Sequence, residues 1–136
     1  MNIDWHLPAE ETQITERRIG RVLVEYEDPE IVTLCDQDDV LYLGVAVDEE
    51  GDVVRWLESV LYPQKYEALL AGTLGVREAL GKPRVWVVDR TREGKPLHAW
   101  SLAVEELPED ALPHPGALLP TATRLRLQQS SRRHIS

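Results

Sequence analysis

The sequence VLYLGVAV occupies residues 40–47 and is apolar at almost every position. A strand that is apolar on both faces is typical of the centre of a buried sheet. Acidic residues stand on either side of it, at residues 36–39 and 48–52, and both groups are typical of turns. The chain then returns through an apolar run at residues 53–61. These features predict a hairpin at the centre of the core, and Gly44 within it indicates a bulge or a close backbone approach.

Two further strands are expected before this hairpin. Residues 21–26 alternate between apolar and polar side chains, and residues 30–35 are rich in β-branched ones. The sequence Glu-Asp-Pro at residues 27–29 lies between them and is typical of a turn. The first four strands should therefore form an antiparallel meander with short connections.

A second hairpin is expected from residues 84–90 and 97–104. Residues 92–94 are typical of a three-residue loop with glycine in the left-handed position. This register predicts two cross-strand pairs, Trp86 with Trp100 and Val88 with His98.

Between the two groups of strands the period changes to that of a helix. Apolar residues recur at helical spacing in residues 62–72, with Pro63 at the start and Gly72 at the end. A second short helix is expected at residues 76–80, before another glycine and a proline.

Together these patterns predict an α+β fold. We expect a strongly bent antiparallel sheet, or a small partly open barrel, of about six strands with two short helices inserted between strands four and five. Residues 1–18 are expected to form a polar N-terminal arm and residues 19–107 the domain. Residues 108–136 are rich in proline and then in arginine, and are expected to be a flexible tail.

The charge of the chain is strongly negative and uneven. The 136 residues carry a net charge of −9. Of the 15 basic residues four lie in residues 121–136, so residues 1–120 hold 24 acids and 11 bases, a balance of −13. Such a body should repel nucleic acid and anionic membranes. This excess of acidic residues either serves solubility or forms a surface complementary to a basic partner.

The chain has no feature of a secreted or membrane protein. Cys35 is the only cysteine, so an internal disulfide and a multi-cysteine zinc site are excluded. The N-terminus lacks a basic start followed by an apolar run, and the longest apolar runs are only as long as strands. We therefore expect a cytoplasmic protein.

No motif for catalysis, metal or nucleotide binding is found. The chain lacks G-x-S-x-G, a P-loop and G-x-G-x-x-G. An EF-hand register with Gly51 in sixth place would put Ala46 first and Leu57 twelfth, and neither can bind calcium. The histidines His6, His98, His114 and His134 form no local pair. We expect no cofactor, no metal and no catalytic residue.

Four stretches of the chain resemble an uncharacterised family of small bacterial domains. They are EYEDP at 25–29, LYLGVAVDE at 41–49, YPQKYEALLAG at 62–72 and VREAL at 76–80. That family has an EYYDGP-like turn, an apolar strand closed by acids, a helix that starts with Ser-Pro and ends in glycine, and an LRDAF-like helix. This chain departs from the pattern at Tyr62, in place of a capping serine, and at Gly75, in place of a capping acid.

The similarity covers residues 20–90. It implies a bacterial cytoplasmic domain of unknown function and assigns no activity.

The first functional hypothesis is a non-enzymatic protein-binding module, such as an antitoxin, immunity protein, inhibitor or accessory subunit. Its acidic surface would bind a basic partner protein. The contact groups would be the acids of the two turns: Asp36, Asp38, Asp39, Asp48, Glu49, Glu50 and Asp52.

Two alternatives remain. A small ligand-binding sensor or enzyme could use a pocket between helix and sheet, with His98, Cys35 or the pair Tyr62 and Tyr66. In an interaction module the aromatics Trp56, Tyr62 and Tyr66 could line a groove, and a place in the core is the competing interpretation. A regulator could instead touch nucleic acid weakly through the tail arginines Arg124, Arg126, Arg132 and Arg133.

Overall fold

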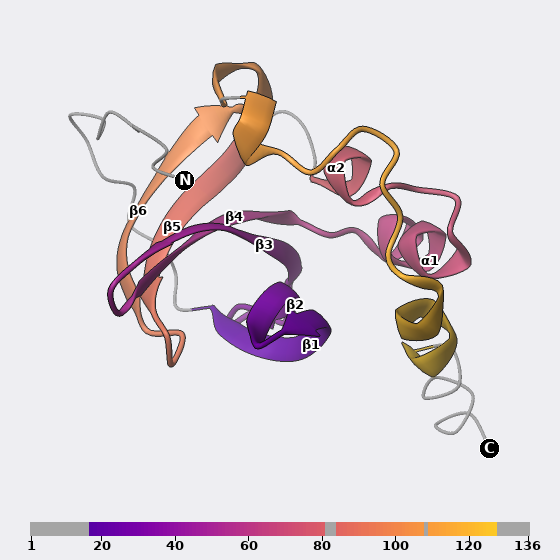
Figure 1. The fold of residues 1–136 in the computed structure, drawn as a ribbon, viewed down its shortest axis with the longest axis horizontal. Helices are drawn as coiled ribbons and strands as arrows, with labels where there is room; N and C mark the ends of the chain where they lie inside the picture. Colours follow the sequence, from indigo (N-terminus) through magenta and orange to yellow (C-terminus); the bar gives the residue numbers. More distant parts are fainter. Residues whose placement is uncertain (1–16, 81–83, 108, 128–136) are drawn as a thin grey trace.

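The computed structural model describes residues 17–80, 84–107 and 109–127. In this part of the chain six strands form one antiparallel sheet in the order β1-β2-β3-β4-β5-β6 (Figure 1). The strands are β1 (Arg18–Tyr26), β2 (Asp28–Cys35), β3 (Leu41–Glu50), β4 (Val53–Val60), β5 (Arg84–Thr91) and β6 (Pro96–Ala103). The expected α+β fold, with all six strands and the meander, is confirmed.

The helices α1 (Pro63–Ala71) and α2 (Val76–Ala79) lie between β4 and β5, as expected. Pro63 is in the first turn of α1, and Gly72 ends it at a φ of 76°. The 3₁₀ turns η1 (Val104–Glu106) and η2 (Glu109–Ala111) follow β6. A further helix at residues 121–127 was not expected. The sequence interpretation placed these residues in a flexible tail, yet Leu119 and Leu127 are almost fully buried in the core.

Gly75 explains one departure from the resembled family. Glu78 lies where a β-carbon on Gly75 would be, and its carboxylate accepts the Gly116 N–H at 3.2 Å. A capping acid has no room at this position unless Glu78 moves. Glu78, in the first turn of α2, thus joins this helix to the loop at Gly116.

One face of the sheet, here called the helix-covered face, carries Leu43, Val45, Leu57, Val87 and Trp100. Leu69 of α1 packs on it, as do residues from α2 and from the chain after β6. Figure 1 shows α1, α2 and the helix at residues 121–127 on the same side of the molecule. This is the larger part of the core.

The opposite face, here called the self-covered face, carries a smaller cluster made only of strand residues. Val32, Leu34 and Trp56 form its centre. Gly44 makes room for them, since a β-carbon there would lie 2.8 Å from Leu34 Cδ1 and 3.1 Å from Val32 Cγ2. Gly44 is thus approached by side chains rather than by another backbone, and the register shift of this hairpin lies between Ala46 and Asp48 instead of at Gly44.

The sheet curls until the start of β1 meets the β5–β6 hairpin. The Arg17 carbonyl accepts a hydrogen bond from Arg90 Nη1 at 3.3 Å. A β-carbon on Gly94 would lie 3.2 Å from Ile19 Cδ1. The first strand and the last hairpin are thus neighbours across the self-covered face, although β1 and β6 are the two edges of the sheet.

The predicted register of the β5–β6 hairpin is wrong by one residue. The loop itself is as expected, with Gly94 at a φ of 95° and Arg90 opposite Pro96. A bulge at Leu97 then shifts the register, so that Asp89 faces His98 and Val87 faces Trp100. Trp86 and Trp100 consequently lie on opposite faces of the sheet.

Candidate functional site

The acidic residues that the sequence analysis joined into one surface lie beyond the two ends of β3. Asp36, Asp38 and Asp39 are before its start, and Asp48 to Asp52 are at its end and in the following turn. A strand rises about 3.3 Å per residue, so residues 40–47, which lie between the two groups, hold them more than about 20 Å apart. The expected acidic surface is therefore two separate acidic ends of the sheet.

At the first end, Asp36 is committed to its own turn. Its Oδ1 accepts the backbone N–H groups of Asp38 at 2.8 Å and Val40 at 3.0 Å, and its Oδ2 accepts the Tyr42 hydroxyl at 3.1 Å. The Val40 hydrogen bond, together with those from Asp38 and Tyr42 and the charge of Arg17, holds the pKa of Asp36 below its ordinary value, against a smaller effect of burial. Desolvation, and then the bond to Asp36, raise the pKa of Tyr42.

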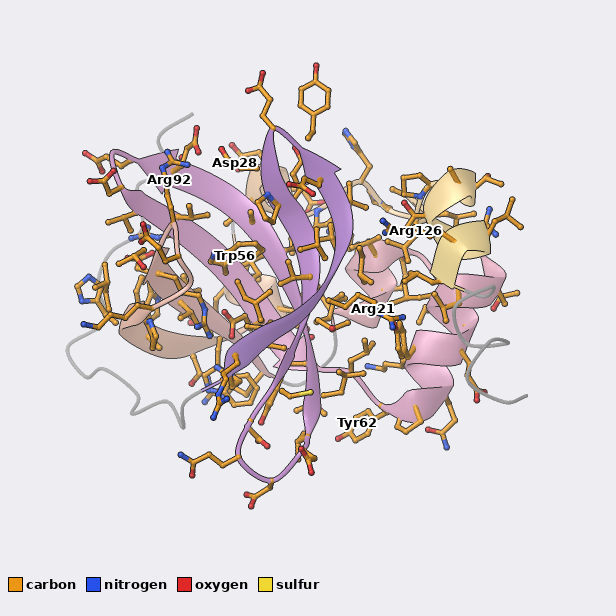
Figure 2. All side chains as sticks on the ribbon, turned by 90° about the horizontal axis from the view of Figure 1, so that it is seen from below. Arg21, Asp28, Trp56, Tyr62, Arg92 and Arg126 are labelled. Atoms are coloured by element: carbon orange, nitrogen blue, oxygen red, sulfur yellow. The ribbon has the colours of Figure 1, made fainter. Side chains whose placement is uncertain are left out.

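At the other end, three turns of the meander meet around a groove of about 330 Å³. They are the β1–β2, β3–β4 and β5–β6 turns, and Figure 2 shows Asp28 and Arg92 at this end with Trp56 further inside. We call this the three-turn groove. It is lined by Ile19, residues 26–30, residues 46–49, Val54, Trp56, Thr91, Arg92 and Gly94.

The lining of the three-turn groove has an apolar floor and an acidic rim. Trp56, Ile19 and Val54 belong to the cluster on the self-covered face, so the floor is part of the core. The rim includes five acidic residues, Glu27, Asp28, Glu30, Asp48 and Glu49, and one arginine, Arg92. Tyr26 also lines the groove and is 77% exposed. Such a site can hold an apolar side chain below a positive charge.

Arg92 links the three turns around the groove. Its Nη2 donates to the Gly51 carbonyl at 2.9 Å and lies 3.3 Å from Glu49 Oε2. Its Nη1 donates to Asp28 Oδ2 at 3.3 Å. The side chain is 36% exposed, so water screens these ion pairs. Arg92 shows that a guanidinium fits between the acids of this rim.

A second group of charges lies out of reach of solvent on the self-covered face. Glu58 on β4 and Arg90 on β5 are both fully buried. Their side chains form a two-pronged ion pair, with Nε to Oε2 at 2.8 Å and Nη2 to Oε1 at 3.0 Å. Arg17 Nε lies 3.2 Å from Glu58 Oε1, so one carboxylate serves two guanidinium groups.

The Arg17 guanidinium is held between two aromatic rings. Its Cζ is 4.3 Å from the centre of the Tyr42 ring and 5.2 Å from that of Trp86. This contact offsets part of the cost of burying the charge. These buried charges join β4, β5 and the residue before β1, and none of the three residues lines the three-turn groove, although Arg90 Nη1 donates to the carbonyl of the lining residue Gly94 at 2.9 Å.

Sequence reasoning singled out neither Arg92 as a site residue nor the Glu58–Arg90 pair. In a meander, alternate turns fall at the same end of the sheet, which would have brought residues 27–30, 48–52 and 92–93 together. Glu58 follows Val54 and Trp56 on one face of its strand, and Arg90 follows Trp86 and Val88. Opposite charges at apolar-face positions of neighbouring strands are the signal of a buried pair.

Cys35 and His98 do not come together. Cys35 pairs with Leu41 at the start of β3, and His98 lies in the register row that reaches Asp48 through β5 and β4. Seven residues of β3 separate these rows by more than about 20 Å. His98 Nε2 is instead 3.9 Å from Asp89 Oδ2, and Asp89 is held by Arg55 at 2.7 and 2.9 Å.

The three expected groove aromatics do not share a groove. Trp56 is 4% exposed on the self-covered face. Tyr66 packs against the core of the helix-covered face, and Tyr62 is exposed beside Lys65. Of the three, only Trp56 belongs to the lining of the three-turn groove.

Two of the four tail arginines are engaged in the fold. Arg124 Nε donates to the Leu119 carbonyl at 3.1 Å, and Arg126 Nη2 donates to carbonyl oxygens of β1. Arg132 and Arg133 lie outside the described residues, as do His6, His134 and most of the predicted N-terminal arm.

Among the described residues, no three His, Cys, Asp or Glu side chains are placed to hold a metal ion. No helix in that part of the chain is long and apolar enough to cross a membrane. Comparison with protein-family models, with curated proteins and with solved structures finds no match. The resemblance to the bacterial family therefore stays a prediction.

Proposed function

We propose that this protein is a non-enzymatic binding module that holds a basic segment of a partner protein in the three-turn groove. The observation that carries the proposal is the composition of the groove, which is lined by five acidic residues, one arginine and an apolar floor that includes Trp56. Charge complementarity of this kind speeds association and selects a partner. A bacterial cytoplasmic antitoxin, immunity protein, inhibitor or accessory subunit would fit this role.

The groove favours a segment in which an apolar side chain stands next to lysine or arginine. The apolar side chain would contact Trp56 and Val54, while the cation would lie among the rim acids as Arg92 does. Tyr26 at the rim offers exposed aromatic area, which is a frequent source of binding energy at interfaces.

The test uses charge reversal at the two acidic ends of the sheet. A capped heptapeptide of alternating arginine and leucine is titrated into the protein, and the indole N–H signal of Trp56 is followed by NMR. The double variant Glu27→Lys/Glu30→Lys should lose binding at least about tenfold, because it replaces two rim carboxylates by cations.

The matched control is Asp38→Lys/Asp39→Lys in the β2–β3 turn. It makes the same change of net charge at exposed positions, and each pair contains one residue with a left-handed backbone, Glu27 at a φ of 63° and Asp39 at 62°. This control should keep the affinity within about twofold at moderate salt. Equal losses in the two variants, or no shift of the Trp56 signal, would refute the proposal. Products of neighbouring genes are the first natural partners to assay.

A further inference from the structure

A second groove runs along the free edge of β1. Within residues 17–80, 84–107 and 109–127 this strand is at one end of the sheet order and pairs with β2 alone. The helix at residues 121–127 and Pro120 before it form the other wall of a groove of about 350 Å³, opposite residues 22–25 of the strand. The groove therefore has one wall of strand backbone and one wall of helix.

Arg126 crosses this groove from the helix to the strand. Its Nη2 donates to the carbonyl oxygens of Val22 and Leu23, each at 3.3 Å (Figure 2). Two acceptors at the edge of the sheet are thus engaged by a side chain, where a neighbouring strand would offer backbone N–H groups. Both bonds are long and Arg126 is exposed, so each contributes little and another donor can replace it.

Such an edge is suited to strand addition. A peptide that extends a sheet is held by main-chain hydrogen bonds, and its alternate side chains supply the specificity. Here the strand supplies the backbone partners, and the helix at residues 121–127 covers one side of the added segment.

The arginine side chains near this edge favour an acidic binding partner. Arg18 and Arg21 are exposed, and they share a face of β1 because they pair with Cys35 and Thr33. The groove lining itself holds one guanidinium, from Arg126, and one carboxylate, from Glu25, and Arg18 and Arg21 add two guanidinium groups on the part of β1 that precedes the groove. The edge is therefore basic on a protein whose net charge is −9.

We infer that the groove between β1 and residues 121–127 binds an extended acidic segment of a partner protein as an additional strand. Its backbone N–H groups take over the carbonyl oxygens that Arg126 holds, and its carboxylates face Arg18 and Arg21. This site is separate from the three-turn groove and accepts the opposite charge, so the protein can bind two segments at once.

The test is an NMR titration with capped heptapeptides in which glutamate alternates with valine, threonine or tyrosine. Saturable shifts should appear at the backbone amides of residues 22–25 and 120–126. The same peptides N-methylated at every residue cannot donate main-chain hydrogen bonds from either edge and should not bind. Binding that survives N-methylation, or the absence of binding by all peptides, would overturn the inference.

Charge variants give a second readout on the folded full-length chain. Arg21→Glu should weaken peptide binding about fivefold or more, and Arg18→Glu gives an independent measurement at the same edge. Arg84→Glu is the matched control, because Arg84 is also an exposed strand residue but lies on β5. Equal effects of Arg21→Glu and Arg84→Glu would overturn the site.

Other occupants would give different results. Concentration-dependent shifts at residues 22–25 without peptide, together with a dimer in sedimentation velocity, would assign the edge to a second copy of the chain. Binding of oligo-dT at these residues in preference to the peptides would assign it to nucleic acid. Either result would overturn the inference of an acidic peptide.

Discussion

The helix-covered face and the self-covered face of the sheet bury their side chains by different means. The first is covered by helices and loops and is aliphatic around Trp100. The second is a small strand-only cluster beside the fully buried charges of Glu58 and Arg90. Apolar contacts are tolerant of small shifts, whereas a two-pronged ion pair fixes distance and direction.

We infer from this difference that the buried charges set how the sheet curls. Glu58 binds Arg90 on the next strand and Arg17, the residue before β1. A shift of one residue in β4 or β5 would turn these side chains to the wrong face and leave them unpaired. The ionic cluster thus provides specificity where the apolar area is small.

The largest expected effect is therefore at Glu58. The Glu58→Ala variant leaves two buried guanidinium groups without their carboxylate and should lower the free energy of unfolding by about 3–5 kcal/mol. Urea denaturation followed by tryptophan fluorescence measures the loss.

A triple variant with methionine at positions 17, 58 and 90 separates stability from specificity. It should recover most of the loss, because no buried charge is left unpaired. If it unfolds cooperatively with an unchanged NMR pattern, the charges do not set the curl of the sheet and our inference is wrong.

The apolar face should respond to cavities instead. Leu69 of α1 is fully buried on it, and Leu69→Ala should cost about 3 kcal/mol by removing packed methyl groups. Leu125, which is 54% exposed on the helix at residues 121–127, is the control, and Leu125→Ala should change the stability by less than about 0.5 kcal/mol. A small loss at Leu69 would mean that α1 is loosely attached.

Glycine substitutions in the turns at the two ends of the sheet should change the free energy of unfolding by smaller amounts. Glu27 and Asp39 both have a left-handed backbone, which glycine adopts without strain. Glu27→Gly should raise the free energy of unfolding by about 0.5–1 kcal/mol, and Asp39→Gly by less, since aspartate tolerates this region better. Thermal unfolding of both variants tests the order, and a destabilised Glu27→Gly would show that the side chain supports the groove.

The smallest effect is a dependence on pH at the β2–β3 turn. Folding lowers the pKa of Asp36 from its ordinary value of 3.8, so the ionised group stabilises the fold above that pH and the contribution is lost as the pH falls below it. Asp36→Asn should flatten stability curves between about pH 5 and pH 2. Asp38→Asn removes one charge from the same turn and should leave the curve unchanged in shape.

Local patterns predicted most of the fold. Alternation and turn residues located every strand, and Pro63 and Gly72 located α1, because those signals act within a few residues. The helix at residues 121–127 was missed because four prolines precede it between residues 108 and 120 and its apolar residues are few. Its one buried residue, Leu127, belongs to a core cluster made of residues distant in sequence, such as Leu23.

The sites were predicted less well because they depend on how distant segments meet. The acids at residues 48 and 49 were selected, but their neighbours across the groove, Asp28 and Arg92, come from other turns. The acids of the β2–β3 turn were placed with them only because they are close in sequence. Charge composition identifies a type of surface, and topology decides which residues share it.

The bulge at Leu97 has a consequence for comparing this chain with its relatives. Because one added residue there carries Trp100 to one face and leaves Trp86 on the other, a relative lacking that residue would exchange the environments of everything downstream in the strand. A gap in an alignment at this position would mean that different side chains of β6 are buried on each face, even though the hairpin loop keeps its length.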